Sequence, residues 1–187
     1  STDAVLREMD SLDRPFAEGH TTELNLDMLS WLEGIERSGF EGEILMADYG
    51  HAAPEYFSPE RREGTLRRYY QHKSDDRVLD NLGECDLTAH VNFTRVAQQA
   101  KALGWEVTEF IEQGRFLTRV ASEMMKRPGF QPDAAWMLQF QTLTHPGHLG
   151  HSFQIMTLRK GMDSHTDSVG EQRRAALRRL GISDEQG

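Results

Sequence analysis

The sequence has 187 residues and a formal net charge of −9, with 37% hydrophobic and 27% charged residues. This length suits one domain with a sizeable core, and the composition is that of an acidic globular protein. The acidic balance argues against general binding to nucleic acids or anionic membranes, because both need a basic surface.

The cysteine content and the N-terminal residues bear on the cellular compartment. Cys85 is the only cysteine, so no disulfide can form within the chain and a reducing compartment is favoured. No apolar run reaches the length of a membrane span, and the N-terminal residues lack the basic and apolar regions of a secretory signal. We therefore expect a cytoplasmic protein.

The first part of the chain has the pattern of an α/β fold. Residues 3–12 predict a short amphipathic helix that Pro15 ends, and we interpret residues 1–18 as the remnant of a longer helical segment. A second helix is expected after an N-cap at Asn25. The apolar run 44–47 predicts a strand buried on both faces, as in a parallel sheet with helices on either side.

Asp48 follows this strand at its carboxyl end, where open α/β sheets bind their ligands. Its carboxylate could position a guanidinium group or accept a proton. Alternatively, it could cap the following turn through a local hydrogen bond. Both interpretations stay open. Residues 51–63 contain two prolines and predict a loop.

Most of the distinctive polar groups lie in two neighbouring segments. The first, residues 64–72, combines a hydroxyl, two guanidinium groups, two phenols and an imidazole, and we expect some of these groups to contact a ligand. The second, residues 86–93, alternates polar and apolar residues, which predicts an extended segment with one polar face. That face carries Asp86, Thr88, His90 and Asn92. It either points into water or lines a cleft opposite the first segment.

Two further clusters suggest ligands. A local group of arginines is compatible with an anionic ligand, and its members are Arg61, Arg62, Arg67 and Arg68. Three histidines recur at positions 145, 148 and 151, but across a Pro/Gly turn without a nearby carboxylate or cysteine. This arrangement favours a solvated turn over a metal site, and we expect no metal.

The second half of the chain predicts alternating helices and strands. The expected elements are a helix from an N-cap at Asn92 to 103, a strand 105–111, a helix 116–124, a helix from an N-cap at Asp133 to 143, a strand 153–158 and one surface helix in a charged tail, 161–187. The apolar stripe of the helix 116–124 is interpreted as core rather than as a cofactor-binding face.

The two polar segments resemble the signature of the MidA-like methyltransferases. The residues that carry this resemblance are Gly64, Thr65, Leu66 and Arg67, with Tyr70, His72 and Gly83, and the run from Asp86 to Phe93. Glu23-Leu24-Asn25, Asp48-Tyr49-Gly50 and Gln113-Gly114 with Phe116-Leu117 agree in order and spacing. The MidA-like methyltransferases are class I S-adenosylmethionine-dependent enzymes of bacteria and mitochondria. The resemblance covers roughly residues 19–158.

Two features depart from this family. The family holds its methyl donor with a glycine-rich loop after the first strand, and no G-x-G pattern occurs in this chain. The chain therefore resembles only the C-terminal half of such an enzyme, with the donor-binding half missing. In addition, Asn92 stands where the family usually carries Asp.

The resemblance implies an α/β fold that is the C-terminal part of a class I methyltransferase sheet, with flanking helices over 19–160 and a final antiparallel hairpin. It implies S-adenosyl-L-methionine as the cofactor. The implied activity is N-methylation of protein arginine, as in the mitochondrial members that assist complex I assembly. The implied location is the bacterial cytoplasm or the mitochondrial matrix. The catalytic candidates are Asp48, Glu23 and Asp86. The candidates for acceptor binding are Tyr49, Gly64, Thr65, Arg67, Tyr70, His72, Thr88 and His90.

A second hypothesis is a non-catalytic protein-interaction or assembly module that keeps the acceptor-side surface but does not hold the donor. The missing glycine-rich loop favours it for the chain alone. A half-sheet would also leave an open edge and an uncovered apolar strand face, which predicts self-association or a complementary partner.

Overall fold

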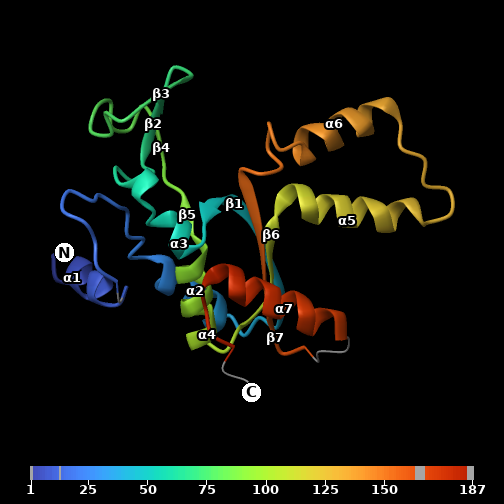
Figure 1. The fold of residues 1–187 in the computed structure, drawn as a ribbon, viewed down its shortest axis with the longest axis horizontal. Helices are drawn as coiled ribbons and strands as arrows, with labels where there is room; N and C mark the ends of the chain where they lie inside the picture. Colours follow the sequence, from blue (N-terminus) through green and yellow to red (C-terminus); the bar gives the residue numbers. More distant parts are fainter. Residues whose placement is uncertain (1, 13, 163–166, 185–187) are drawn as a thin grey trace.

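The computed structural model describes residues 2–12, 14–162 and 167–184 (Figure 1). Its helices are α1 (Thr2–Asp10), α2 (Met28–Arg37), α3 (Ala53–Tyr56), the 3-10 helix η1 (Pro59–Arg61), α4 (Phe93–Ala102), α5 (Gln113–Met125), α6 (Ala134–Thr144) and α7 (Asp167–Leu180). Its strands are β1 (Gly42–His51), β2 (Arg67–Tyr70), β3 (Lys73–Asp75), β4 (Asp86–Thr88), β5 (Val91–Asn92), β6 (Glu106–Glu112) and β7 (Phe153–Lys160). Within these ranges, no helix is both long and apolar enough to cross a bilayer.

The central sheet has the strand order β5-β1-β7-β6. Strand β7 pairs antiparallel with both of its neighbours, so the predicted strands at 105–111 and 153–158 are adjacent, as expected. Strand β5 pairs parallel with β1, at Gly50 and His51. This sheet and the helices around it form a mixed α/β fold, which confirms the predicted fold class.

Strand β1 differs from the strand that the apolar run predicted. Its long partner β7 is antiparallel, and only one of its faces is covered. Ile44 and Met46 pack against the core, whereas Leu45 is 54% exposed and Ala47 is also exposed. Successive side chains of a strand point to opposite faces, and no described helix covers the second face. The expectation of burial on both faces is therefore wrong for this chain.

The core lies between the sheet and helices α2, α4 and α7. Trp105, Val96 and Leu158 are among its fully buried residues, and the apolar face of α7 joins them through Ala176, Leu177 and Leu180. The helix predicted in the charged tail is thus present, but it belongs to the core instead of the surface. Residues 163–166 and 185–187 of that tail lie outside the described residues.

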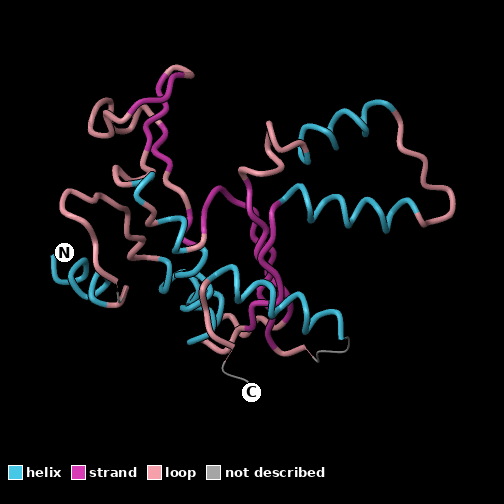
Figure 2. The backbone as a smooth tube through the Cα atoms, viewed as in Figure 1, coloured by secondary structure: helices cyan, strands magenta, loops and turns pink. Residues whose placement is uncertain are grey.

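Helices α5 and α6 form an arm that projects away from the sheet (Figures 1 and 2). The two helices pack on each other through an apolar cluster that includes Leu117, Ala121 and Phe140. Of the predicted core stripe, only Ala121 is fully buried, because α6 is its main neighbour and covers one side of it. The stripe is therefore a satellite cluster and not a part of the main core.

A second projection is the small antiparallel sheet β3-β2-β4 (Figure 1). Strands β2 and β3 are joined by a two-residue turn at Gln71 and His72, whose φ angles are 50° and 62°. Both residues have the left-handed conformation that tight hairpin turns need. The sequence has no Asn-Gly or Asp-Gly signal at this turn, so no local pattern predicts the hairpin.

Helix capping is confirmed at two of three predicted positions. Asn92 Oδ1 accepts a hydrogen bond from the Arg95 N–H, and Asp133 Oδ1 accepts one from the Trp136 N–H. The third prediction is wrong, because the N-cap of α2 is Asp27 and not Asn25. Asn25 instead accepts a hydrogen bond from the Asp27 N–H, an Asx-type turn just before the helix.

Candidate functional site

A cavity of about 910 Å³ lies between the small sheet and the end of β1. Its walls combine carboxylates, phenols and imidazoles from three segments, namely Tyr49, Tyr69, Gln71, His72, Gly83, Glu84, Cys85, Asp86, Thr88, Ala89 and His90. The alternating residues Asp86, Thr88 and His90 thus share one cavity, opposite residues of the 64–72 segment. For these three residues the structure supports the cleft, whereas Asn92, the fourth member of the predicted face, caps helix α4 and does not line the cavity.

Glu23 holds the segment that precedes the cavity. Its carboxylate accepts hydrogen bonds from the Thr65 N–H (2.9 Å), the Leu66 N–H (3.0 Å) and the Thr65 hydroxyl (3.0 Å). The Tyr56 hydroxyl donates a further one at 3.4 Å. Burial, together with the Glu23 charge, raises the pKa of Tyr56 to about 12. Glu23 therefore joins three segments that are distant in sequence, and both of its oxygens are engaged.

Gly64 leaves the space that this carboxylate occupies. Its φ is +73°, and a Cβ added there would lie 2.2 Å from Glu23 Oε1. Both observations require glycine, because other residues rarely adopt this φ and their Cβ would displace the carboxylate. Gly64 accordingly acts through Glu23, and it does not line the cavity.

His90 is fixed to the same network through its backbone. Its N–H donates to the Thr65 hydroxyl oxygen at 2.9 Å, and Thr65 is only 8% exposed. The His90 ring stacks on Tyr49 with centroids 6.4 Å apart and lies 5.1 Å from the ring of His51. Burial lowers the pKa of His90 and of His51 below their ordinary values, and the nearby Arg61 charge lowers both further.

Six of the predicted site residues do not line the cavity. Three of them, Glu23, Gly64 and Thr65, form the network described above, and the other three are Asp48, Arg67 and Tyr70. Asp48 faces another, apolar cavity of about 390 Å³, because neighbouring residues of β1 point to opposite faces. Its Oδ1 accepts a hydrogen bond from the Tyr49 N–H at 2.8 Å, which resembles the local capping role considered for it. Arg67 donates to its neighbouring carbonyl at Leu66, and Tyr70 lies under the Arg68 guanidinium at 5.6 Å.

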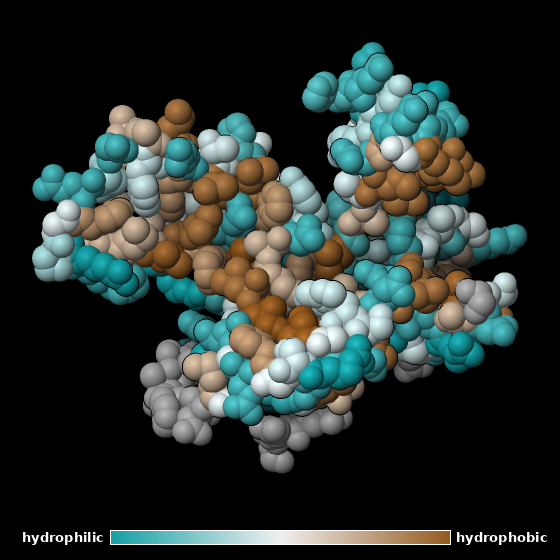
Figure 3. All heavy atoms as spheres, turned by 180° about the vertical axis from the view of Figure 1, so that it is seen from behind, coloured by the Kyte–Doolittle hydropathy of each residue, from teal (hydrophilic) through white to brown (hydrophobic). Residues whose placement is uncertain are grey.

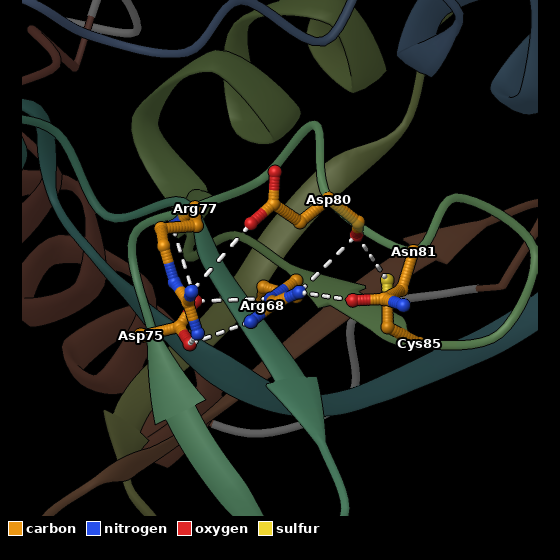
Figure 4. A network of polar contacts seen from close by, with 6 residues as sticks. All are labelled: Arg68, Asp75, Arg77, Asp80, Asn81 and Cys85. Carbon is orange, nitrogen blue, oxygen red and sulfur yellow. Dashed lines mark hydrogen bonds and ion pairs between the residues drawn. The ribbon is translucent and has the colours of Figure 1, made fainter.

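Arg68 is enclosed in the small sheet (Figure 4). It is 2% exposed and donates to both oxygens of Asp75, to the Asn81 side chain and to the Asp80 carbonyl. The hydrogen bonds from Arg68 hold the pKa of Asp75 well below its usual range. The predicted arginine group therefore does not act as one patch for an anionic ligand, since Arg68 is used inside the sheet.

The three histidines after α6 do not converge. The rings of His145 and His148 are 5.2 Å apart, and His145 Nδ1 accepts a hydrogen bond from the Gly147 N–H. His151 lies 3.5 Å from Glu112 instead. Across the residues that the structure describes, no three His, Cys, Asp or Glu side chains are grouped as metal ligands.

The residues present do not by themselves fit a methyl donor of the S-adenosylmethionine type. A donor cradle needs glycines whose missing side chains leave room for the ligand. The glycines with open space beside an added Cβ are Gly39, Gly83 and Gly129. They lie in three separate turns and do not form a glycine-rich loop, so we derive no step that involves the donor from these residues.

Sequence reasoning missed several residues of this region. Tyr69, Glu84 and Cys85 line the cavity because the β2–β4 pairing brings them to it, and this pairing was not foreseen. His51 was placed in a loop, whereas it ends strand β1 beside His90. The apolar run 44–47 is the sequence signal that could have placed His51 in a strand, because extending that strand by four residues reaches His51.

Comparison with known proteins finds a matching family and structures of similar fold. Residues 1–111 match the family described as "Putative S-adenosyl-L-methionine-dependent methyltransferase". No curated protein matches the chain. Two crystal structures from Burkholderia thailandensis are similar in fold. One is an uncharacterized COG1565 superfamily protein, with 23% identity and a TM-score of 0.71 over 88% of this chain.

The second structure is a COG1565 superfamily member bound to S-adenosyl-homocysteine, with 23% identity and a TM-score of 0.72 over 91% of this chain. The alignments cover 45% of each of these two proteins, so this chain spans less than half of their length. The match over residues 1–111 covers more than half of the present chain. The chain therefore belongs to this family of S-adenosyl-L-methionine-dependent methyltransferases.

Proposed function

We propose that this chain forms the acceptor side of a methyltransferase that uses S-adenosyl-L-methionine and modifies an arginine nitrogen of a protein substrate. The observation that carries the proposal is a cavity walled by carboxylates and aromatic rings in a chain of this family. Of the three catalytic candidates, Asp86 is the one that lines this cavity.

The cavity walls suit a planar, cationic nitrogen group. Asp86 and Glu84 supply carboxylates, with which a guanidinium forms strong, charge-assisted hydrogen bonds. Tyr69 is 44% exposed, and the face of its ring can attract a cation. The Tyr49 ring, which packs on Phe153 with centroids 3.9 Å apart, adds an aromatic wall. Thr88, His72 and His90 complete the walls with a hydroxyl group and two imidazoles. In this proposal Asp86 orients the acceptor, and the aromatic rings limit its rotation.

Other predicted site residues hold the walls of the cavity in position. Glu23, Gly64 and Thr65 hold the backbone at His90 through the hydrogen bonds described above. A cavity wall that is fixed in this way can align an acceptor without first paying the cost of ordering a loop. We assign these three residues to positioning and Asp86 to direct contact with the acceptor.

The donor would come from a complementary part of the protein fold. Strand β1 has an open edge from Gly42 to Tyr49 within the described residues, and Leu45 is 54% exposed beside it. In the view of Figure 3, apolar side chains gather over the α5–α6 arm and continue toward the middle of the molecule. Open edges and exposed apolar areas favour pairing with another chain or segment. We propose that the donor-binding part of the enzyme pairs with this edge.

The acceptor proposal is tested with three peptides of one sequence that carry arginine, lysine or citrulline at the same position. Citrulline has nearly the shape of arginine but no charge. We expect the arginine peptide to shift the NMR signals of Tyr69, Asp86 and His90, and we expect a smaller shift with lysine and none with citrulline. Equal shifts with all three peptides would rule out recognition of a guanidinium. Asp86→Asn should weaken the arginine peptide about tenfold, the loss of one good ion pair.

The donor proposal needs a separate assay. Calorimetric titration of the chain alone with S-adenosyl-L-methionine should show no binding, and binding at micromolar concentration would contradict the donor-site argument. Methylation of the arginine peptide, followed by mass spectrometry, should require the chain together with the part of the Burkholderia relative that it does not span. Unmodified peptide in that mixture would count against a catalytic role.

The alternative is an interaction or assembly module that keeps the acceptor-side surface without catalysis. The observation in its favour is that this chain contains no G-x-G pattern for a donor-binding loop. Binding of the arginine peptide without any methylation in the complemented mixture would favour this alternative. Methylation would exclude it.

A further inference from the structure

His51 and His90 form an unusual pair behind the wall of the cavity. Their rings are 5.1 Å apart and inclined by 50°. Each ring has one buried nitrogen without a hydrogen-bond partner, Nε2 of His51 and Nδ1 of His90. Because a buried polar atom without a partner is costly, a pair of them on neighbouring rings calls for an explanation.

One shared proton would satisfy both nitrogens. In a neutral imidazole one nitrogen carries a proton and the other accepts, so two such rings can form an N–H···N hydrogen bond. With a donor–acceptor distance of about 3 Å, the ring centroids of such a pair lie about 5 Å apart. The observed spacing of 5.1 Å is therefore that of two rings able to share a proton after a small rotation.

The two outer ends of this pair reach different environments. On one side, His90 lines the large cavity. On the other side, His51 Nδ1 lies 3.3 Å from the Glu55 carboxylate, at the end of the short helix α3. The side chain of His51 is 17% exposed and that of Glu55 is 59% exposed. The three residues therefore lead from the cavity, through a buried pair, to a carboxylate in water.

The surrounding charges favour neutral imidazoles, which can both accept and donate. Arg61 and burial disfavour protonation of the two rings, whereas Glu55 favours a charge on His51, and Glu23 and Asp48 favour one on His90. The Arg67 charge also lowers the pKa of His90, as the Arg61 charge does. The backbone around the pair is fixed, because the His90 N–H is bonded to Thr65 and His51 pairs with Asn92.

We propose that His90, His51 and Glu55 form a proton relay between the cavity and solvent. The inference rests on the proposed function, because the acceptor nitrogen must lose one proton when it gains a methyl group. That proton goes to His90 Nε2, the proton on His90 Nδ1 goes to His51 Nε2, and the proton on His51 Nδ1 passes to Glu55 and then to water. Each imidazole gains one proton and loses one, so both remain neutral and end in the other tautomer.

The relay is tested by NMR on the ¹⁵N-labelled chain, without donor or acceptor. A scalar coupling across the hydrogen bond between His90 Nδ1 and His51 Nε2 is expected, since it arises only when the two nitrogens share a proton. In a pH titration, the ring signals of both residues should move in the same two steps, because the first proton belongs to the pair. Independent titration curves and no coupling would overturn the relay.

Three variants separate the relay from a merely structural pair. His51→Leu should abolish the coupling and leave His90 with a single titration step. Glu55→Gln keeps the fold with little change, since its side chain is largely exposed, and it should preserve the coupling while His51 takes up its proton at lower pH. His20→Gln is the control, because His20 also has a buried nitrogen without a partner but its neighbouring ring is Phe16, at a tilt of 39°. It should change neither signal.

The NMR test of the histidine pair does not depend on the methylation assay. If the coupling is present and the complemented protein transfers no methyl group, the proposed function fails, and what stands is the shared proton between His51 and His90. If methyl transfer occurs and the two histidines titrate independently, the relay alone is wrong. A His51→Leu protein in which His90 titrates as in the unchanged chain would likewise overturn it.

Discussion

The interior of the small sheet and the wall of the neighbouring cavity both contain polar side chains, but the two regions differ in how completely these side chains are hydrogen-bonded. In the sheet, Arg68 donates from each of its three nitrogens, and its partners Asp75 and Asn81 are engaged (Figure 4). In the cavity wall, His51 and His90 each keep a buried nitrogen without a partner. Fully paired polar groups stabilise a structure, whereas unpaired ones are available for chemistry. The following predictions test this difference.

The largest effect is expected from Arg68→Met. This change removes the donors of a residue that is 2% exposed, so Asp75 and Asn81 lose their partner. We expect the strands β2, β3 and β4 to lose order while the main core stays folded, since its residues lie in the other sheet. Hydrogen exchange should show fast exchange over residues 67–75 and slow exchange over 153–160.

The matched control for this change is Arg77→Met. Arg77 contacts the same Asp75 carboxylate at 3.0 Å but is 65% exposed, so its ion pair is weakened by water. Little change in exchange is expected. If both variants lost protection equally, the enclosed position of Arg68 would not be the reason for its importance.

Gly64→Ala is expected to have the next largest effect on stability. A left-handed φ costs a residue with a side chain roughly 1–3 kcal/mol, and the new Cβ would also displace the Glu23 carboxylate. Urea unfolding measures the loss. Gly129→Ala is the control, because Gly129 has a φ of +82° with no atom within 4 Å of the added Cβ. Equal losses would mean that the contact with Glu23 contributes nothing.

Glu23→Gln should destabilise the chain by about 1–3 kcal/mol, the cost of replacing a charged acceptor of several hydrogen bonds. It should also lower the pKa of Tyr56 from about 12 toward its ordinary value of 10.0, because the Glu23 charge is one of the causes that raise it. Ultraviolet absorbance of the phenolate follows this titration. Thr65→Val removes a hydrogen bond that lowers the pKa of Tyr56, so this variant should not bring that pKa down.

The smallest effect on stability is expected from Arg61→Gln. The Arg61 charge lowers the pKa of both His51 and His90, so its removal should raise both values and let the rings take up protons at higher pH. NMR titration of the ring protons measures the shift. Arg62→Gln should move neither histidine, since Arg62 is not a cause of either shift. A rise in one histidine alone would argue against the two rings sharing one environment.

Much of the fold could be predicted from local sequence patterns. The caps at Asn92 and Asp133 and the shared face of Asp86, Thr88 and His90 follow from capping chemistry and periodicity, which act between near neighbours in the chain. Their agreement with the structure shows that local preference and tertiary packing point in the same direction at these places. The pairing of 105–111 with 153–158 was expected from the family resemblance alone.

Other features depend on contacts that no local pattern contains. Gln71 and His72 adopt a left-handed turn because strands β2 and β3 pair around them, although neither residue prefers that conformation. The sequence of α7 predicts a surface helix, but in the structure its apolar face packs against strand β6. In both cases the packing of distant segments outweighs the intrinsic preference of the residues.

The sequence by itself determined the family, the mixed α/β class and the set of polar residues around the cavity. The tertiary structure decided which of them meet. Glu23 contacts Thr65 across 42 residues, Arg68 turns into the small sheet, and His51 lies beside His90. The physical reason is that residue types and their spacing fix the chemistry available to a chain, whereas strand pairing and burial fix which groups are satisfied within the fold and which remain free to react.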